Sequence, residues 1–579
     1  MTNTIDIPAH LASLFHFALR EVAADADPAL VEIERPREAA HGDYACSVAL
    51  RLSKLLRVQP RTLALQLQAA LPPSALVART EIAGAGFINV FLHPLAWQQI
   101  VPHVLEHGER FGHNRQGEGR SVQVEFVSAN PTGPLHVGHG RGAAYGASLA
   151  NLLAASGYRV SREYYVNDAG RQMDILALST WLRYLECCGE TLVFPANAYQ
   201  GGYVRQMAQA IFSQHGTRYR HAAAPLYATA PDAATEADAH LDHLIAQAKQ
   251  TLGDGYLYFH AFALNEQLND CRNDLHEFGV EFDQWFSEQT LFDQGVVQRT
   301  LKVLQEHGHL YEQDGALWFR STRYGDEKDR VVQRENGLYT YFASDIAYHL
   351  HKFERGFSWL IDIWGADHHG YIPRVRGALE ALGKNPDQLT VSLVQFAVLY
   401  RNGQKAAMST RSGEFVTLRE LRDEVGNDAA RFFYILRKSD QHLDFDLDLA
   451  KSRSNDNPVY YIQYAHARIS SVLTQWGGDV EQLVRADCSP LVSAHERELL
   501  QRLAEYPGVI SAAARELSPH LLAYALKEIA AALHAYYNAE QFLLEDETLR
   551  TARLALIAAT RTVLRNGLTL LGISSPDHM

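Results

Sequence analysis

The chain is poor in cysteine and has no long apolar segment. It contains five cysteines in 579 residues, none in a Cys-x-x-Cys pair, so a zinc site built on cysteine is not expected. No apolar run reaches the ~20 residues that span a membrane. The first residues lack the basic start and apolar core of a signal peptide. These absences argue against a disulfide-rich secreted protein and predict a reducing, cytoplasmic setting without a membrane partner.

Internal repeats are also lacking, and the only compositional bias is the alanine-rich stretch 222–239. Hydrophobic residues make up 47% of the chain and charged residues 21%, which predicts a packed globular protein of about three or four domains. The net charge is −14. Residues 451–579 hold 12 basic and 14 acidic side chains, so the acidity is concentrated before them. Local fields govern binding, and this composition therefore permits a nucleic-acid partner without predicting one.

The patterning divides the chain into four segments. Residues 1–112 read as an α+β unit, with helices at 10–24 and from Pro60, a strand at 85–92 and a glycine-rich linker at 108–119. In residues 113–400 strands alternate with helices, which predicts a parallel sheet with ligands at the carboxyl ends of its strands. The expected strands are 122–127, 160–166, 314–319, 338–342 and 359–365, and residues 188–275 look like an insertion.

The rest of the chain reads as helical from about residue 417. Residues 401–450 are expected to connect the parallel sheet to a helical bundle formed by residues 451–579. Within the bundle, the apolar periodicity predicts helices at 499–514, 521–537 and 549–571.

The most informative motif follows the strand at 122–127. A loop with two prolines leads to His136-Val-Gly-His139, and a helical pattern begins directly after it. A helix N-terminus offers unpaired N–H groups to an anion, and each histidine can donate a hydrogen bond to a phosphate or ribose oxygen. The arrangement suits a nucleoside triphosphate that is attacked at its α-phosphate. A purely structural pair of histidines at a turn is the alternative.

Residues 128–142, Ser-Ala-Asn-Pro-Thr-Gly-Pro-Leu-His-Val-Gly-His-Gly-Arg-Gly, resemble the signature of class I aminoacyl-tRNA synthetases and, within that class, the arginyl-tRNA synthetases. The resemblance runs from about His41 to Met579. It implies a Rossmann-like α/β catalytic domain, an N-terminal α+β domain that contacts tRNA, and a C-terminal all-α helix bundle that binds the anticodon. It also implies catalytic or ATP-binding roles for His136, Gly138 and His139.

The second signature of the class, Lys-Met-Ser-Lys, is degraded here. Met408-Ser409 remains and would contact ATP, but Ala407 and Thr410 stand where the class has lysines. Gly133 stands where some arginyl-tRNA synthetases carry a compensating lysine. Arg411, or else Lys405, would then supply the missing cation to pyrophosphate, with Arg411 the first choice as a catalytic residue. A solvated basic turn is the alternative for either one.

Recognition of arginine should depend on carboxylates, because a guanidinium is planar, always charged and rich in donors. Tyr341 and Asp345 are four residues apart, one helical turn. They resemble the Tyr-x-x-x-Asp element by which arginyl-tRNA synthetases hold the arginine side chain. The resemblance adds Glu125, Ser128 and Asn130 as arginine ligands. Taken alone, Asp345 could equally cap a helix.

The loop Gly365-Ala-Asp-His-His-Gly-Tyr371 follows another expected strand. It offers Asp367 to ATP and His368 to arginine, and Gln172 is a weaker substrate-site candidate. A metal bound by Asp367 and the two histidines is the minor alternative, because no helical ligand spacing such as His-Glu-x-x-His accompanies them. No protein-bound metal is therefore expected, and Mg²⁺ would arrive with ATP.

Recognition of tRNA is assigned to both ends of the chain. Tyr461 and Arg468 share a helical face on which an aromatic ring can stack on a base and a guanidinium can clamp phosphate. A tyrosine-rich core helix is the alternative. The resemblance brings these two residues forward, adds Met579 near the anticodon, and suggests Asn89 as a contact of the N-terminal domain.

Together these features predict an arginine–tRNA ligase that uses ATP, L-arginine and tRNA(Arg). The resemblance implies that tRNA must bind before arginine is activated. No obligate protein partner is expected, and a monomer is the default because no sequence feature marks a subunit interface. Two rivals remain: a class I synthetase for another amino acid, and a non-catalytic tRNA-binding paralogue, which the missing lysines make worth testing.

Overall fold

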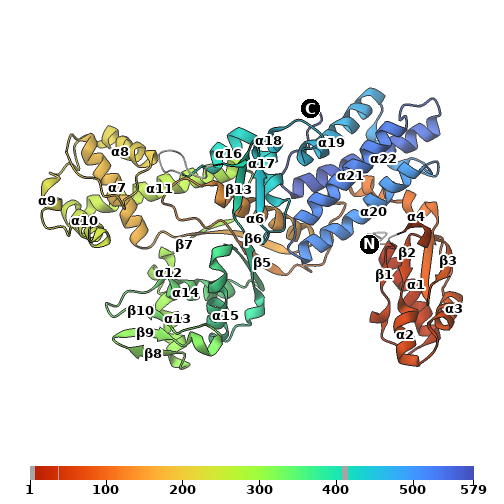
Figure 1. Cartoon of the computed structure of the whole chain (residues 1–579), viewed down its shortest axis with the longest axis horizontal. Helices are drawn as coiled ribbons and strands as arrows, with labels where there is room; N and C mark the ends of the chain where they lie inside the picture. Colours follow the sequence, from red (N-terminus) through yellow and green to blue (C-terminus); the bar gives the residue numbers. More distant parts are fainter. Residues whose placement is uncertain (1–6, 37, 407–414) are drawn as a thin grey trace.

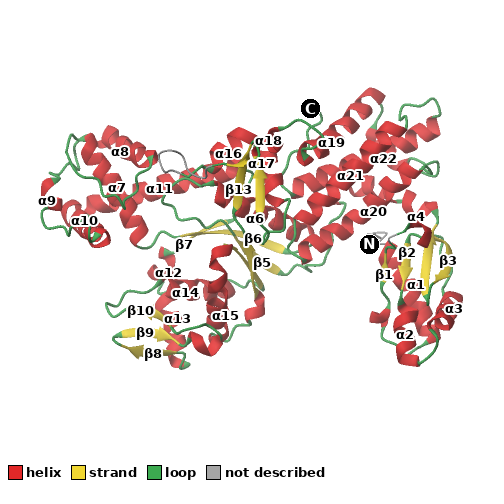
Figure 2. Cartoon of the chain, in the orientation of Figure 1, coloured by secondary structure: helices red, strands yellow, loops and turns green. Residues whose placement is uncertain are grey.

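The structure is a computed structural model that describes residues 7–36, 38–406 and 415–579. Figure 1 shows a central parallel sheet, a helical extension on one side of it, and the C-terminal helices on the other side, with the N-terminal domain beside them. Figure 2 shows helices throughout the molecule, with strands in the N-terminal domain, in the middle and in a small sheet below the middle. In the described part of the chain, no helix is long and apolar enough to cross a membrane.

The N-terminal domain is an antiparallel sheet, in the order β1-β2-β4-β3, covered by helices. The helices predicted at 10–24 and from Pro60 and the strand predicted at 85–92 are confirmed as α1, α3 and β4. Proline fits the first turn of α3 because the N–H that it lacks has no helical partner there. The elements are α1 (Ile7–Val22), η1 (Pro28–Leu30), β1 (Ile33–Glu34), η2 (Ala39–His41), β2 (Tyr44–Cys46), α2 (Val48–Leu56), α3 (Pro60–Ala70), β3 (Val77–Ala83) and β4 (Phe87–Leu92). Three short helices, α4 (Pro94–Gln98), α5 (Ile100–His107) and η3 (Gly108–Arg110), lead out of the domain.

The central sheet is parallel throughout and has the order β12-β11-β5-β6-β7. From β5 the chain first adds strands on one side and later on the other, so the strand order reverses between β5 and β11. Such a reversal opens a crevice at the carboxyl ends of the strands, where ligands of α/β proteins bind. The elements are β5 (Ser121–Glu125), α6 (Val137–Ala155), β6 (Arg159–Val166), α7 (Arg171–Cys187), β7 (Gln284–Ser287), α14 (Tyr341–Glu354), β11 (Trp359–Gly365), η5 (Ala366–Tyr371), α15 (Ile372–Ala381), η6 (Pro386–Gln388) and β12 (Leu389–Val394).

Helix α6 approaches the sheet closely because small residues line its buried face. A Cβ atom at Gly146 would lie 2.4 Å from the ring of Phe126, whereas one at Gly142 would meet nothing within 4 Å. The ring of Phe126 is itself fully buried and has little room to move. The packing of α6 against the end of β5, and with it the position of the His136 motif, therefore depends on a glycine at position 146.

We expect Gly146→Ala to destabilise the catalytic domain by about 1–3 kcal/mol through overpacking. Gly142→Ala is the matched control in the same helix, and it should gain up to about 1 kcal/mol from helix propensity. Thermal unfolding of the two variants beside the parent chain measures both effects. A Gly146→Ala chain that melts as high as Gly142→Ala would contradict the close packing.

Residues 188–275, read from the sequence as an insertion, form helices with a core of their own. Trp181 and Tyr184 of α7 pack there with Leu244 and Phe259. The helices are α8 (Gly202–His215), α9 (Ala224–Tyr227), α10 (Ala237–Leu252) and α11 (Asp254–Glu277). Figure 1 shows this unit extending away from the N-terminal domain.

A small antiparallel sheet, in the order β10-β9-β8, precedes α14. The strand predicted at 338–342 is wrong, because α14 already begins at Tyr341. Thr340 hydrogen-bonds to the backbone of β10, and Tyr339 forms only an isolated bridge with Gln333. Apolar side chains at helical spacing then bury one face of α14, and this packing outweighs the β propensity of the tyrosines. The elements are α12 (Gln289–Asp293), α13 (Val296–Glu306), β8 (Leu310–Gln313), β9 (Ala316–Phe319), η4 (Ser321–Tyr324) and β10 (Arg330–Gln333).

The C-terminal part is helical as predicted, with one exception. β15 (Leu443–Asp446) pairs in parallel with β13, and its buried–exposed alternation is a strand signal too short to stand out in the sequence. The other elements before the bundle are β13 (Ala397–Arg401), β14 (Gln404–Lys405), α16 (Leu418–Val425), α17 (Asn427–Ile435) and α18 (Leu447–Lys451). The bundle contains α19 (Pro458–Trp476), η7 (Val480–Arg485), α20 (Ala494–Arg515), α21 (His520–Ala539) and α22 (Glu547–Leu570).

Candidate active site

The loop after β5 contains two residues with left-handed backbone. Val127 has a φ of 66° and Ser128 a φ of 40°, conformations that cost energy in residues with a Cβ atom. The Ser128 hydroxyl donates to Oε1 of Glu125 at 3.0 Å and accepts the N–H of Tyr165 at 3.1 Å. These bonds help to offset the strain, and they hold Ser128 between the carboxyl ends of β5 and β6.

His136 and His139 close the N-terminus of α6 with reciprocal hydrogen bonds. Nδ1 of His136 accepts the N–H of Gly138 at 3.1 Å, and Nδ1 of His139 accepts the N–H of His136 at 3.2 Å. Because both Nδ1 atoms accept, each neutral ring carries its proton on Nε2. A Cβ atom at Gly138 would lie 2.8 Å from the His136 ring, so the motif needs glycine between the histidines.

The two imidazoles are neutral donors rather than cations. Burial lowers the pKa of His136, and burial together with His136 lowers the pKa of His139 to about 3. The ring centroids are 3.7 Å apart. At neutral pH the site can therefore present two Nε2–H groups, backed by the positive end of α6, to phosphate or ribose oxygens.

A buried ion cluster supports Glu125, which is 8% exposed. Nζ of Lys352 lies 2.5 Å from Oε2 of Glu125 and 2.8 Å from Oδ1 of Asp362, and His349 bonds the other oxygen of Asp362 at 2.7 Å. Burial would lower the pKa of Lys352, but the two carboxylates raise it. Glu125 and Asp362 are partners in adjacent strands. Lys352 bridges the two carboxylates and His349 holds the second oxygen of Asp362, so the cluster fixes Glu125 beneath the end of β5.

Asn130 is exposed at the end of the loop. Its Oδ1 accepts a hydrogen bond from the side chain of Asn167 at 3.1 Å, which joins it to the loop after β6. Asn130 and Ser128 thus lie with Glu125 at the carboxyl ends of the strands, where ligands are expected. Gln172, the weaker candidate, lies at the start of α7. It accepts a hydrogen bond from the hydroxyl of Tyr199.

Tyr341 and Asp345 lie one turn apart at the start of α14. Thr340 is the N-cap of that helix, so the alternative reading of Asp345 as a helix cap is wrong. Tyr371 donates a hydrogen bond to Oδ2 of Asp345, and burial raises the pKa of this carboxyl group. Tyr341 is 54% exposed, and a Cβ atom at Gly170 would lie 3.7 Å from its hydroxyl. The phenol therefore reaches the loop after β6.

Glu288 belongs with these residues, although no motif in the sequence points to it. It follows β7 directly, and its N–H bonds the last carbonyl of β6, that of Val166. It is 3% exposed, and its Oε2 has no hydrogen-bond partner among the described residues. Burial raises its pKa to about 7, and the charge of Asp345 acts in the same direction. Ser344 and Tyr165 lie within hydrogen-bonding range of the carboxyl group, but its Oε2 lacks a partner, and a buried charge that is incompletely satisfied is costly, which marks Glu288 as a candidate for a cationic ligand.

Asp367 and His368 occupy η5, directly after β11. Their side chains are 61% and 62% exposed, and Oδ2 of Asp367 lies 3.6 Å from Nε2 of His368. The Asp367 carboxylate turns back over Gly365, where a Cβ atom would lie 2.4 Å from it. Within the described ranges, these residues are not part of any group with metal-ligand geometry. Both side chains lie at the carboxyl ends of the strands and are open to a ligand.

Met408, Ser409 and Arg411 of the second signature lie outside the described residues. The chain that follows them is described, and it runs beside the His136 motif. Thr417 forms a bridge with His136, and the N–H of Val137 donates to the carbonyl of Val416 at 3.1 Å. On the other side, Lys405 is exposed in β14. The chain that follows the second signature thus lies directly beside the first one.

The candidate anticodon residues lie in an aromatic cluster on α19 and α21. The Arg468 guanidinium lies 4.7 Å from the ring centroid of Tyr464 and 4.4 Å from that of Tyr537. Tyr461 packs on His534 with 4.5 Å between their ring centroids. Arg468 is therefore held by cation–π contacts, and the cluster combines aromatic faces with a positive charge.

Met579 is 53% exposed and lines a cavity of about 480 Å³ at the start of α19. Lys451, Arg453 and Tyr460 line the same cavity. The carbonyl of Pro576 accepts a hydrogen bond from His466 of α19 at 3.0 Å, which holds the end of the chain against the helix. A terminal methionine beside basic and aromatic groups can meet an unpaired base.

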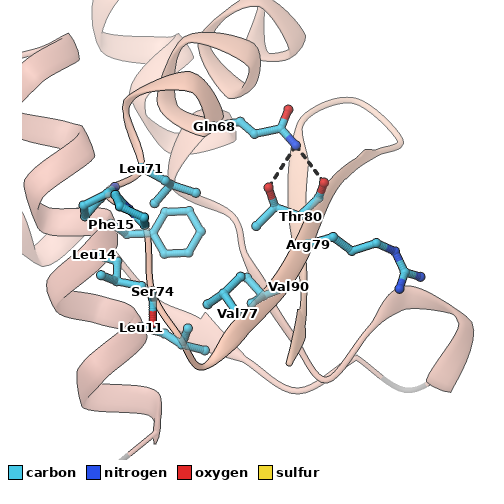
Figure 3. A pocket seen from close by; sticks show the side chains of 12 residues that line it. Leu11, Leu14, Phe15, Gln68, Leu71, Ser74, Val77, Arg79, Thr80 and Val90 are labelled. Carbon is cyan, nitrogen blue, oxygen red and sulfur yellow. Dashed lines mark hydrogen bonds between the residues drawn. The ribbon is translucent and has the colours of Figure 1, made fainter. Parts of the chain in front are cut away.

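Asn89 is only 5% exposed in β4, so little of its side chain is open to a tRNA. Another cavity of the N-terminal domain, about 190 Å³, lies between α1, α3 and the sheet (Figure 3). Gln68 points into it and donates to the carbonyl and hydroxyl oxygens of Thr80 at 2.8 and 3.0 Å. Asn89 does not line this cavity, and its role stays a prediction.

Comparison with known proteins shows to which family the chain belongs. Residues 9–92 match the family model of the arginyl tRNA synthetase N terminal domain, and residues 462–579 match the DALR anticodon binding domain. Residues 100–186 and 266–444 match the catalytic domain of class I (R) tRNA synthetases. The arginine–tRNA ligase of Nitrosospira multiformis is 62% identical, over 99% of both chains. This chain belongs to the arginyl-tRNA synthetase family.

Other members of the family agree in length and fold. The arginine–tRNA ligase of Nitrosomonas eutropha is 60% identical over the whole of both chains. The arginyl-tRNA synthetase of Thermus thermophilus matches in structure with a TM-score of 0.74, over 99% of this chain and 100% of that one. At 23% identity this likeness concerns the fold. The stretch between the two catalytic matches, residues 187–265, overlaps the helical unit around α8 to α11.

Proposed function

We propose that this chain is an arginine–tRNA ligase, which activates L-arginine with ATP and transfers it to the 3′ end of tRNA(Arg). The observation that carries the proposal is the half-buried carboxyl group of Asp345 beside the buried one of Glu288, at the same carboxyl end of the sheet as the His136 motif. Two carboxylates in fixed positions match a guanidinium, which is planar and permanently charged. Membership in the arginyl-tRNA synthetase family supports the same substrate.

In the first step, a carboxylate oxygen of arginine attacks the α-phosphorus of ATP. A new P–O bond forms, the bond to the β-phosphate breaks, and pyrophosphate leaves. Glu125, Ser128 and Asn130 are proposed to hold the amino end of arginine, and Tyr341 and Asp345 its side chain. Neutral His136 and His139 would donate to ATP oxygens, so that catalysis depends on positioning and electrostatic stabilisation. Asp367 is proposed to contact ATP and His368 arginine.

In the second step, a hydroxyl of the terminal ribose attacks the arginyl carbonyl and AMP leaves. Tyr461, Arg468 and Met579 are proposed to hold the anticodon at the far end of the molecule, and Asn89 to contact tRNA from the N-terminal domain. An aromatic–arginine cluster supports base stacking with phosphate contact. Mg²⁺ is proposed to enter with ATP, since phosphate oxygens supply most of its ligands.

The proposed domains are residues 1–112, 113–400, 401–450 and 451–579, with the insertion near 188–275. A cytoplasmic location is proposed because all five cysteines are free thiols, as is usual in a reducing compartment. A monomer without an obligate protein partner remains the default proposal.

Arginine-dependent ATP–pyrophosphate exchange, with and without total tRNA, tests the function. We expect exchange with arginine alone among the amino acids, and only when tRNA is present. Comparable exchange with several amino acids would favour a class I synthetase of other specificity. Binding of tRNA without any exchange would favour a non-catalytic paralogue.

The replacement for the missing lysines is tested by Arg411→Ala. If Arg411 stabilises the departing pyrophosphate, this variant should lose about 10²–10³-fold in exchange rate, as when one transition-state donor is removed. Arginine KM should change little, because the contact is to pyrophosphate. Lys405→Ala is the matched control in β14, and a loss confined to Lys405→Ala would transfer the role to that residue.

A further inference from the structure

Helix α5 carries a group of metal-ligand side chains far from the His136 motif in sequence. His103, Glu106 and His107 stand at positions i, i+3 and i+4, so they share one face of the helix. One ligand atom from each lies within 4.8 Å of the other two, and the described residues contain no other group of this kind. The spacing His-x-x-Glu-His is also that by which a helix presents two histidines to Zn²⁺ in one class of metalloproteases.

Hydrogen bonding prepares one ring for a metal. Nδ1 of His107 lies 2.9 Å from the backbone carbonyl of His103, and a carbonyl can only accept, so Nδ1 carries the proton. Nε2 of His107 then holds a free lone pair, the form in which imidazole binds a metal. Donation of the second ring N–H to a backbone carbonyl is a usual outer contact of metal-binding histidines.

His103 is fixed by packing rather than by hydrogen bonds. It is 9% exposed, and its ring lies 4.1 Å from that of His107 and 5.8 Å from that of Phe111, centroid to centroid. No described residue makes a hydrogen bond to its ring nitrogens. Glu106 is the exposed member of the three, which leaves its carboxylate free to turn toward the rings.

These side chains face a cavity of about 1070 Å³ between the N-terminal domain, α5 and α20. His103, Glu106 and His107 all line it, so a metal can enter and keep solvent ligands. Arg35, which also lines it, is neutralised by Glu505. Arg110 and Arg115 bring positive charge to the same space, which favours an anion over a second cation as the remaining ligand.

We propose that His103, Glu106 and His107 form a site for one divalent transition-metal ion of the Zn²⁺ type. Two imidazoles and a carboxylate suit Zn²⁺ better than Mg²⁺ or Ca²⁺, which prefer all-oxygen sets. Tetrahedral Zn²⁺ with bonds of ~2.0–2.1 Å needs ligand atoms about 3.4 Å apart, a contraction that side-chain rotation on one helix face can supply. Three protein ligands leave one position for water or an anion. This proposal departs from the expectation from the sequence that the protein binds no metal of its own.

The test is calorimetric titration of the full chain with Zn²⁺, after chelator treatment and removal of the chelator. We expect one stoichiometric site in the parent chain and at least about a tenfold weaker Kd in His107→Gln and in Glu106→Gln. His113→Gln is the matched control, because His113 lines the same cavity outside the cluster. Titration with Co²⁺ should give visible absorption bands of a low-coordinate site, which the two ligand variants lose.

Glu106→Gln also separates a lost ligand from a damaged fold, because Glu106 is exposed. Its metal-free chain should melt with the metal-free parent chain, and Zn²⁺ should raise the melting temperature of the parent chain only. Absence of a stoichiometric site in the parent chain would overturn the proposal. So would a Zn²⁺ affinity that falls in His113→Gln as far as in His107→Gln, since the metal would then lie elsewhere in the cavity.

Discussion

Replacement of Glu288 by glutamine should reduce kcat/KM for arginine by about 10²–10³-fold, the loss expected when one partner of a buried charge pair is removed. Glu288 is 3% exposed, and its Oε2 has no partner in the described part of the chain. Glutamine keeps the shape and presents a neutral amide to the guanidinium. Steady-state exchange kinetics over a range of arginine concentrations measure the effect.

The same residue should make arginine binding depend on pH. Burial raises the pKa of Glu288 to about 7, whereas arginine stays charged throughout. Below pH 7 the free site is protonated and must release a proton to form the ion pair. The Kd for arginine should therefore rise about tenfold for each pH unit below 7, and Glu288→Gln should remove this slope.

The stability that Glu288 contributes should change with pH in the direction opposite to arginine binding. This difference separates a binding role of Glu288 from a structural one. A carboxyl group whose folded pKa is about 7 binds its proton more tightly in the folded chain, so its stability contribution falls as pH rises from the unfolded value of ~4.3 toward 7. At pH 8, Glu288→Gln should therefore be at least as stable as the parent chain while it binds arginine poorly. Asp293→Asn, an exposed carboxylate of α12, is the control for charge, and it should leave both properties unchanged. Joint loss of stability and arginine binding in Glu288→Gln would point to a structural carboxyl group instead.

How much of the site could be predicted depends on how locally it is built. His136 and His139 were found because a strand, a loop and a helix start follow one another within a few residues, and the structure has all three. Glu125 and Asp345 are predicted from the resemblance to family motifs, and they lie at the end of β5 and in the first turns of α14; their roles stay predictions. Glu288 gave no local signal, because an isolated glutamate after a short strand is usually a surface residue. It joins the site only because β7 lies beside β6, a pairing that the sequence does not reveal.

Buried charge is a second feature that sequence patterns miss. Lys352 is near the end of an amphipathic helix, where lysine normally lies in solvent. Here it is fully buried, because its ammonium group reaches Glu125 and Asp362, which lie side by side on β5 and β11. Local patterns therefore predict the strand, loop and helix start that carry the His136 motif, but not the buried charges that lie beneath Glu125.

Lys352→Met should be the most disruptive single substitution in this support. It leaves Glu125 and Asp362 buried without their cation, which costs about 3–5 kcal/mol when one partner of a buried ion pair is removed. The pKa of Glu125, already raised by burial, should rise further, so that Glu125 is neutral and no longer attracts the ammonium group of arginine. Urea unfolding and arginine KM measure the two consequences, and KM should rise even where the variant is fully folded.

A double variant distinguishes between two roles of Lys352, keeping Glu125 ionised and packing alone. Adding Asp362→Asn to Lys352→Met removes one of the two unpaired charges, so the stability lost in the single variant should be partly regained. Arginine KM should stay high, because Glu125 still lacks the cation that keeps it ionised. Lys302→Met, with a side chain 75% exposed on α13, is the control and should change stability by less than about 0.5 kcal/mol. If arginine KM recovered together with stability in the double variant, Lys352 would act through the fold alone, and the charge of Glu125 would not depend on it.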